Sequence, residues 1–326
     1  MKVLVTGATG FTGFALSREL IKQGNDVVAF VRSPSSAKKL QDIGAECRVV
    51  DIRDSDDVNK NFVNFERVYH IAAAYRGENV GYEEFNRVNI DATRNMLDAS
   101  VACGVDRFVH CSTIGVQGDI EDPPATEDYR FSPHDHYQES KLAGELLARE
   151  YFDKGLVKGA VVRPTAIYGP GDTRFLKLFR GINSGYFVMI GDGSNNYHLN
   201  YIDDMVQGIL LAGEKNAAIG EVFTIGGSNS VTVSELVAMI AEIMGKPKPK
   251  LRVPFFPMYL AAVVCEKVCK LVHISPPLYP RRLDFFRARR SFSIEKAKKL
   301  LGYEPHTDLK QGLIKTAEWY KKSGML

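Results

Sequence analysis

The sequence predicts an α/β fold, with a doubly wound parallel sheet and a smaller C-terminal lobe. In the first half, short apolar runs alternate with segments long enough to be crossover helices. This alternation implies a parallel sheet that is covered by helices on both faces. The 326 residues suffice for one large α/β unit with an appended lobe. The alternation ends after about Gly169, where we expect the lobe to begin.

Apolar runs and capping signals predict the elements in order. Six buried strands are expected at residues 3–5, 27–31, 47–50, 67–71, 108–109 and 160–162. A helix is expected after the turn at 201–204, and a further strand at 222–225. Thr232 and Glu235 form a capping-box pattern, which predicts a helix through Met244. The last predicted helix spans about residues 309–322.

Composition excludes several classes of protein. The net charge of +3 is too balanced to indicate a nucleic-acid partner. Five cysteines without a CxxC pair favour free thiols over a disulfide or metal site, and no signal-peptide pattern opens the chain. The longest apolar run, residues 253–265, is shorter than the roughly 20 residues of a membrane span. We therefore expect a cytoplasmic protein without a metal or a transmembrane segment, although a helix lying on a membrane surface stays compatible.

A glycine-rich turn directly follows the first predicted strand. Residues 6–13 read TGATGFTG, immediately before a predicted helix. A helix N-terminus offers unpaired N–H groups, and glycines let a pyrophosphate approach that backbone. The turn therefore predicts a Rossmann-type NAD(P) site, with contacts from Gly7, Thr9, Gly10, Phe11, Thr12 and Gly13. We expect residues 1–170 to form the NAD(P)-binding domain, with 197–226 returning to it, and 171–326 to form mainly the substrate-binding lobe.

The end of the second strand indicates which cofactor is preferred. A carboxylate at this position would hold the ribose 2′-hydroxyl of NAD, whereas a basic residue accommodates the 2′-phosphate of NADP. The strand is followed by Arg32, with Lys39 further along the chain. This favours NADP(H), with both basic residues on the phosphate, and NAD(H) stays open. Further cofactor contacts are predicted where the third and fourth strands end, at Asp51, Ile52, Ala72, Ala73 and Ala74.

A tyrosine and a lysine with helical spacing form the candidate chemical centre. Tyr137 and Lys141 are four residues apart and so share one helical face. A neighbouring ammonium group favours the phenolate and lowers the tyrosine pKa from about 10. Such a tyrosine suits general acid–base catalysis of alcohol and ketone interconversion. Upstream, a buried strand ends in Ser112 and Thr113, where a hydroxyl would hydrogen-bond the substrate oxygen.

These motifs together resemble the extended short-chain dehydrogenase/reductase family, the NAD-dependent epimerase/dehydratase group. The resemblance includes the glycine-rich turn, Asp51-Ile52, residues 70–73, Asn89, residues 111–113, Tyr137 with Lys141, and residues 163–170. It implies that Tyr137 is the acid/base, that Lys141 binds the nicotinamide ribose, and that Thr113 or Ser112 polarises the substrate oxygen. It also implies a homodimer formed by helices of the first domain. Additional cofactor contacts would come from Asn89, Pro164, Thr165 and Ile167.

Departures from the family patterns bear on the substrate. Thr113 is followed by Ile114-Gly115 rather than the acidic pair of nucleotide-sugar 4,6-dehydratases, which disfavours dehydration. Residues 195–201 lack the arginine with which sugar-nucleotide epimerases clamp the diphosphate. Residues 253–260 and 290–305 resemble instead the 3β-hydroxysteroid dehydrogenase and sterol-4-carboxylate dehydrogenase branch. An apolar lobe suits a hydrophobic alcohol or ketone.

The sequence therefore predicts an NAD(P)-dependent oxidoreductase that acts on a small, hydrophobic, sterol- or isoprenoid-like alcohol or ketone. Two alternatives stay open. One is a UDP-sugar epimerase that uses the same three side chains with transient oxidation, and the other is a non-catalytic NADP-sensing regulator. For the arginine run at 281–290 three alternatives stay open: it binds phosphate, it binds lipid, or it has no ligand. Substrate contacts are predicted for Tyr75, Arg174, Tyr197 and Arg282.

Overall fold

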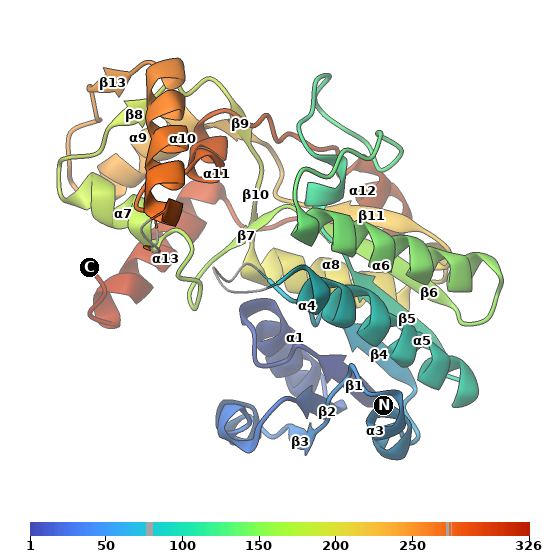
Figure 1. The fold of residues 1–326 in the computed structure, drawn as a ribbon. Coiled ribbons are helices and arrows are strands. Elements are labelled where there is room, and N and C mark those ends of the chain that lie inside the picture. Colours follow the sequence, from blue (N-terminus) through green and yellow to red (C-terminus); the bar gives the residue numbers. More distant parts are fainter. Residues whose placement is uncertain (76–80, 272–273, 275) are drawn as a thin grey trace.

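A computed structural model describes residues 1–75, 81–271, 274 and 276–326 (Figure 1). Its centre is a seven-stranded sheet in the order β11-β6-β5-β4-β1-β2-β3, and every neighbouring pair is parallel. This topology confirms the predicted doubly wound sheet. The strands are β1 (Lys2–Thr6), β2 (Asp26–Val31), β3 (Glu46–Val49), β4 (Arg67–His70), β5 (Arg107–Cys111), β6 (Gly159–Pro164) and β11 (Val222–Ile225).

Helices cover both faces of the sheet, as the alternation predicted. In β1, Val3 and Val5 pack on one core cluster and Leu4 on the other, because successive side chains of a strand point to opposite faces. The first cluster includes α1 (Phe11–Lys22), α2 (Lys38–Asp42) and α8 (Ile202–Glu214). The second includes α3 (Ser55–Asn61), α5 (Ala92–Ala102) and α6 (His136–Asp153). The connection to α5 contains α4 (Tyr82–Asn86) and a π-helical turn, Arg87–Asp91.

The lobe is built mainly from the second half of the chain and lies at the upper left of Figure 1. The capping box of Thr232 and Glu235 is present at the start of α9, as predicted. Short strands pair as β7 (Ala166–Tyr168) with β10 (Leu199–Tyr201), β9 (Asn196–Tyr197) with β12 (Val231–Thr232), and β8 (Met189–Ile190) with β13 (Arg252–Val253). The later helices are α7 (Leu176–Asn183), α9 (Val233–Ile243), α10 (Phe255–Leu271), α11 (Pro280–Leu283), α12 (Glu295–Leu301) and α13 (Leu309–Lys322).

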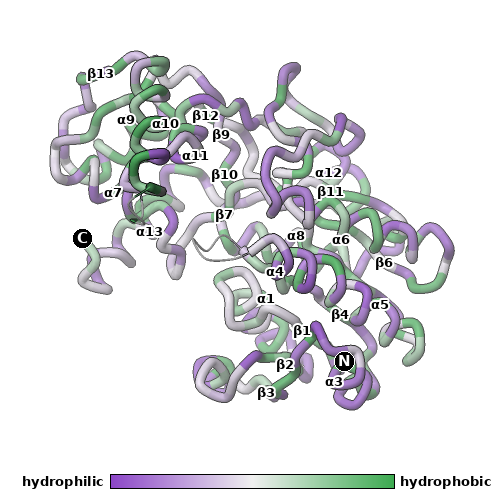
Figure 2. Tube along the Cα trace, viewed as in Figure 1, coloured by the Kyte–Doolittle hydropathy of each residue, from purple (hydrophilic) through white to green (hydrophobic). Residues whose placement is uncertain are grey.

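The apolar run at 253–265 forms most of α10 in the lobe. Figure 2 shows that this helix is strongly hydrophobic, although several of its large apolar side chains are exposed. Across the part of the chain that the structure describes, no helix is both long and apolar enough to cross a membrane.

Candidate functional site

A cavity of about 1580 Å³ extends from the carboxyl ends of the central strands into the lobe. Ligands of open parallel sheets bind at such ends, where the strand order reverses. The cavity brings together residues that were predicted from many separate parts of the sequence. Its lining includes Gly7, Thr9, Gly10, Phe11, Thr12, Gly13, Arg32, Asp51, Ile52, Ala72, Ala73, Ala74, Tyr75, Ser112, Thr113, Tyr137, Lys141, Pro164, Thr165, Ile167, Arg174, Tyr197 and Arg282.

The glycine-rich turn between β1 and α1 closes one end of the cavity. Gly7 has a φ of +67°, and a Cβ on it would lie 2.7 Å from the backbone nitrogen of Ala72. A Cβ on Gly13 would lie 2.2 Å from the carbonyl oxygen of Gly7, so the fold itself requires both glycines. On Gly10, a Cβ would meet only that same oxygen, at 3.3 Å, among the described atoms. The open space beside Gly10 and the N-terminus of α1 therefore fit an anionic group such as a pyrophosphate.

Asn89 and Lys39 are the two predicted cofactor residues outside the cavity lining. Asn89 is almost fully buried, and its Oδ1 accepts a hydrogen bond from the Ala74 nitrogen at 2.9 Å. Its Nδ2 donates to Ser140 Oγ on α6, also at 2.9 Å. Asn89 thus holds the segment after β4 against α6, and it lies behind the residues that line the cavity. Lys39 is exposed on α2.

Charged side chains gather at the cavity end near β2 and β3. Arg32 is exposed and lines the cavity directly after β2. Arg53 forms ion pairs with Asp51 at 2.7 Å and with Glu84 at 2.9 Å. The hydrogen bonds from Arg53 hold the pKa of the Asp51 carboxyl below its usual range. Arg53 and Glu84 were not anticipated from the sequence, because their contact joins residues 31 positions apart on separate elements.

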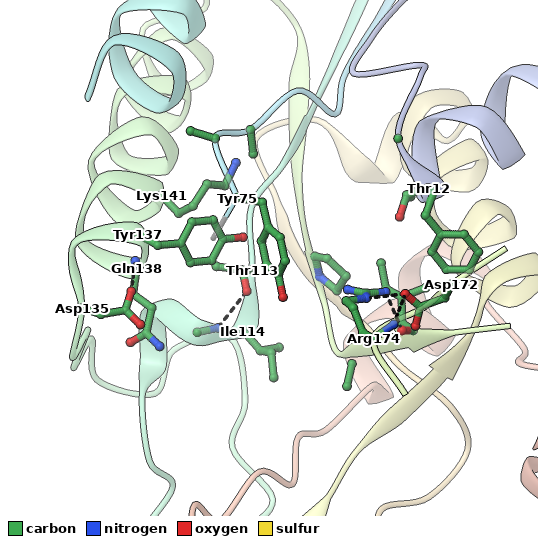
Figure 3. A pocket seen from close by; sticks show the side chains of 18 of the residues that line it. Thr12, Tyr75, Thr113, Ile114, Asp135, Tyr137, Gln138, Lys141, Asp172 and Arg174 are labelled. Atoms are coloured by element: carbon green, nitrogen blue, oxygen red, sulfur yellow. Dashed lines mark hydrogen bonds and ion pairs between the residues drawn. The ribbon is translucent and has the colours of Figure 1, made fainter. Parts of the chain in front are cut away.

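The N-terminal turn of α6 positions Tyr137. Asp135 caps this helix by accepting a hydrogen bond from the Gln138 nitrogen at 2.9 Å. Figure 3 shows the Tyr137 ring pointing into the cavity beside Tyr75 and Thr113. The Tyr75 and Tyr137 rings meet edge to face, with centroids 5.4 Å apart. The cavity wall thus presents two phenol groups and one aliphatic hydroxyl close together.

Lys141 lies one helical turn after Tyr137 and is 2% exposed. Its Nζ donates a hydrogen bond to the Cys111 carbonyl oxygen at 2.6 Å, which links α6 to the end of β5. Burial lowers the pKa of Lys141 from its ordinary value, and the nearby Cys111 and Glu145 side chains oppose that shift. The ammonium group is thus held at the strand end next to the predicted substrate hydroxyls.

The two hydroxyl residues after β5 have different partners. Ser112 Oγ donates to Glu145 Oε2 at 2.6 Å, and Glu145 is paired with Arg163 in a fully buried contact. Thr113 Oγ1 accepts from the Gly115 nitrogen at 3.1 Å, which leaves its hydroxyl hydrogen able to donate. This arrangement favours Thr113 over Ser112 as the group that would contact a substrate oxygen. The Glu145–Arg163 pair was not anticipated from sequence.

The lobe supplies an apolar wall that carries several arginines. Arg174 is held by Asp172 Oδ1 and by the Ile167 carbonyl oxygen, both at 2.7 Å. Tyr197 packs against Phe285 with ring centroids 5.2 Å apart. The apolar lining is formed by Leu178, Phe187, Ile190, Tyr259, Leu278, Leu283, Phe285 and Phe286. Basic lining residues beyond Arg174 are Lys177, Arg282, Arg287 and Arg290.

Comparison with known proteins defines the class. Residues 3–226 match the family described as "NAD dependent epimerase/dehydratase family". The chain therefore belongs to this family of extended short-chain dehydrogenase/reductase enzymes, as its motifs indicated. The glycine-rich turn, the open space at Gly10 and the large cavity fit the nicotinamide dinucleotide on which the family depends.

Similar proteins of known activity fall into two groups. The chain is 29% identical to a 2-alkyl-3-oxoalkanoate reductase of Stenotrophomonas maltophilia, over 96% of this chain and 97% of the relative. It is 28% identical to a 3-beta-hydroxysteroid dehydrogenase of Mycolicibacterium neoaurum, over 98% of this chain and 91% of the relative. Its fold resembles that of a UDP-glucuronic acid 4-epimerase of Bacillus cereus, solved with UDP-glucuronic acid and NAD. The TM-score is 0.78, the identity 27%, and the coverage 99% of this chain and 100% of the other.

Proposed function

We propose that the protein is an NADP(H)-dependent oxidoreductase that interconverts a secondary alcohol and a ketone on a hydrophobic substrate. The observation that supports this proposal is the continuity of the cavity, which joins the glycine-rich turn and Tyr137 to an apolar wall. Burial of nonpolar surface, at roughly 25 cal/mol per Å², would be the main source of substrate affinity. The names of the reductase and steroid dehydrogenase relatives describe substrates with much hydrocarbon surface.

Tyr137, Thr113 and Lys141 would divide the chemistry between them. When bound, the nicotinamide supplies or accepts the hydride. In the reducing direction, the Tyr137 hydroxyl donates a proton to the substrate oxygen while the Thr113 hydroxyl hydrogen-bonds the same oxygen. The ammonium group of Lys141 stabilises the phenolate that remains. In the oxidising direction the phenolate removes the proton from the alcohol.

Arg32 supports the preference for NADP(H). It follows β2 directly and lines the cavity, so its guanidinium group would pair with a ribose 2′-phosphate. Asp51 is further along the wall and is already paired with Arg53, which reduces its capacity to repel that phosphate. The glycine-rich turn and the N-terminus of α1 would hold the pyrophosphate.

A second candidate function is epimerisation of a nucleotide sugar. Arg282, Arg287 and Arg290 line the lobe side of the cavity, and arginine binds diphosphates well because of its planar, bidentate geometry. The fold likeness to the UDP-glucuronic acid 4-epimerase supports this candidate as well. Tyr137 and Thr113 would then act on a ring hydroxyl that is oxidised only transiently.

Measurement of net cofactor turnover distinguishes the two candidates. The purified protein is mixed separately with hydroxysteroids and oxidised cofactor, with 2-alkyl-3-oxo acids and reduced cofactor, and with UDP-sugars, while absorbance of the reduced cofactor is followed. We expect a net absorbance change with a hydrophobic substrate that disappears in Tyr137→Phe. An epimerised sugar, detected by chromatography without net absorbance change, would establish the second candidate instead.

A further inference from the structure

The outer face of α10 carries an apolar stripe, which the exposed Lys267 interrupts near its C-terminal end. Phe256, Leu260, Val264, Val268 and Leu271 are 68, 49, 61, 52 and 79% exposed, respectively. Their spacing of four, four, four and three residues places them on one side of the helix. Single exposed apolar residues are ordinary on protein surfaces, whereas a contiguous apolar surface indicates an interaction site. The stripe is part of the hydrophobic helix labelled α10 in Figure 2.

The inner face of α10 belongs to the protein core and to the cavity wall. Ala262 and Cys269 are buried, and Tyr259 lines the substrate half of the cavity. Leu260, the next residue after Tyr259, already belongs to the outer stripe. The helix α10 therefore lies between the cavity and the outer surface that carries the apolar stripe.

A basic segment leads directly into α10. Lys246, Lys248, Lys250 and Arg252 are all exposed, and the last of them lies in β13, three residues before the helix starts. The sequence contains no acidic residue from Lys246 through Cys265. The surface is therefore positive at one end and apolar along its length, which is complementary to an anionic lipid surface. Basic side chains bind the headgroups, and an apolar helical face enters the boundary between headgroups and acyl chains.

A second copy of the chain fits this surface less well. A stable protein–protein interface uses about 20–30 residues from each partner, and the stripe offers five side chains. This limit on size does not apply to a bilayer.

We propose that α10 lies in the plane of an anionic membrane surface, with its apolar stripe inserted and residues 246–252 on the headgroups. The proposal does not depend on the identity of the substrate. The side chain of Tyr259 would then lie between the lipid and the cavity, so a lipophilic molecule would have a short path from the bilayer to the site.

Co-sedimentation of the full-length protein with vesicles tests this proposal. Vesicles of phosphatidylcholine alone are compared with vesicles containing one-third phosphatidylglycerol. We expect at least about tenfold tighter binding to the mixed vesicles, and weaker binding as salt is added. The double variant Leu260→Glu, Val264→Glu should bind at least about tenfold more weakly, because charged groups resist insertion. The triple variant Lys246→Gln, Lys248→Gln, Lys250→Gln alters no packed atom and should lose the preference for anionic vesicles.

Matched controls change similar residues elsewhere. Leu156→Glu replaces a leucine that is 48% exposed after α6, and Lys321→Gln with Lys322→Gln removes two exposed charges at the end of α13. Both controls should bind as the wild type does, and all variants should keep the wild-type melting temperature and cofactor affinity. Equal binding of wild type to both vesicles, or wild-type binding by the Leu260/Val264 variant, would overturn the proposal. A dimer that this variant converts to a monomer in light scattering would show that a second copy covers the stripe.

Discussion

At the scale of single residues, the site depends on a lysine ammonium group that burial destabilises. Lys141 is nearly inaccessible, and the Cys111 carbonyl oxygen accepts its hydrogen bond. The same low-dielectric surroundings that lower the pKa of Lys141 strengthen its attraction for any negative charge that develops nearby. The phenol of Tyr137, one turn away on the same helix, lines the cavity and can develop such a charge.

The first prediction concerns the Tyr137 hydroxyl. Tyr137→Phe removes only the proton donor, so kcat should fall by about 10² to 10⁴ while the dissociation constant of the cofactor stays within about twofold. Steady-state kinetics and fluorescence titration measure the two quantities. Tyr82→Phe is the matched control, because Tyr82 is exposed and packs on His136 outside the cavity lining. Turnover by Tyr137→Phe near the wild-type rate would exclude the proposed proton transfer.

The second prediction concerns Arg32. Arg32→Ala should raise the dissociation constant of NADPH by about tenfold or more and leave that of NADH within about twofold, because the charge-assisted hydrogen bond to the 2′-phosphate is lost. Lys39→Ala is the control, because Lys39 lies outside the cavity lining and should have the smaller effect. Isothermal titration calorimetry measures both cofactors. Equal affinities of the wild type for NADPH and NADH would refute the preference.

At the scale of elements, the ends of β4 and β5 place two buried histidines side by side. His70 is paired in register with His110, and their stacked rings have centroids 5.7 Å apart. His70 is hydrogen-bonded to Thr6 Oγ1 at 2.8 Å and to Thr93 Oγ1 at 3.1 Å. Burial, followed by the charge of Lys141, lowers the pKa of His70 to about 3. The same two causes lower the pKa of His110. Both imidazoles are therefore neutral in the folded protein at neutral pH.

The third prediction follows from these histidines and concerns stability in acid. Below the ordinary histidine pKa of about 6.5, these imidazoles bind protons in the unfolded chain but stay neutral in the folded chain. The free energy of unfolding therefore falls as pH falls. For His70 alone the loss should reach about 2 kcal/mol by about pH 5, at about 1.4 kcal/mol per pH unit. Urea unfolding of the wild type and of His70→Gln, at neutral pH and at about pH 5, measures this loss in the free energy of unfolding. The variant should show a shallower pH dependence, and His136→Gln, which changes an exposed histidine, should show the wild-type one.

The fourth prediction separates two glycines of the turn between β1 and α1. Gly13→Ala should destabilise the fold by at least about 3 kcal/mol, because its Cβ would lie 2.2 Å from the Gly7 carbonyl oxygen. Gly10→Ala should leave the melting temperature within a few degrees and weaken cofactor binding at least about tenfold, because its Cβ would meet, of the atoms that the structure describes, only the Gly7 carbonyl oxygen, at 3.3 Å, and would otherwise project into the cavity. Differential scanning calorimetry and cofactor titration measure both variants. Wild-type cofactor affinity in Gly10→Ala would place the pyrophosphate elsewhere.

At the scale of the whole molecule, the chain returns to the sheet after it has begun the lobe. β11 pairs with β6 at one edge of the sheet, and α8 packs in the core cluster that includes Val3 and Val5. Lys296 on α12 forms an ion pair with Glu221 at 2.8 Å, next to β11. Residues far along the chain therefore cover one face of the N-terminal half.

Cytoplasmic location and a homodimer formed by helices of the first domain stay predictions. Light scattering would test the homodimer.

The fifth prediction concerns fragments. A fragment of residues 1–170 would expose the face of the sheet that α8 covers, so we expect no cooperative unfolding transition and a tendency to aggregate. A fragment of residues 1–226 regains α8 and β11 and should melt cooperatively. Thermal unfolding followed by circular dichroism compares the two. A cooperative transition in the shorter fragment would show that the first six strands fold without their later neighbours.

Three features could be predicted from the amino-acid sequence: the parallel sheet, the glycine-rich turn and the meeting of Tyr137, Lys141 and Thr113. These features have local signatures: alternating apolar runs, a turn that only glycine permits, and a helical spacing of four. Because the carboxyl ends of parallel strands meet at one edge, motifs at those ends came together without further information. Only the tertiary structure decided that Ser112 faces Glu145, that Asn89 lies behind the wall, and which lobe residues line the cavity. Those outcomes depend on contacts between residues distant in sequence, and such contacts leave no periodic pattern along the chain.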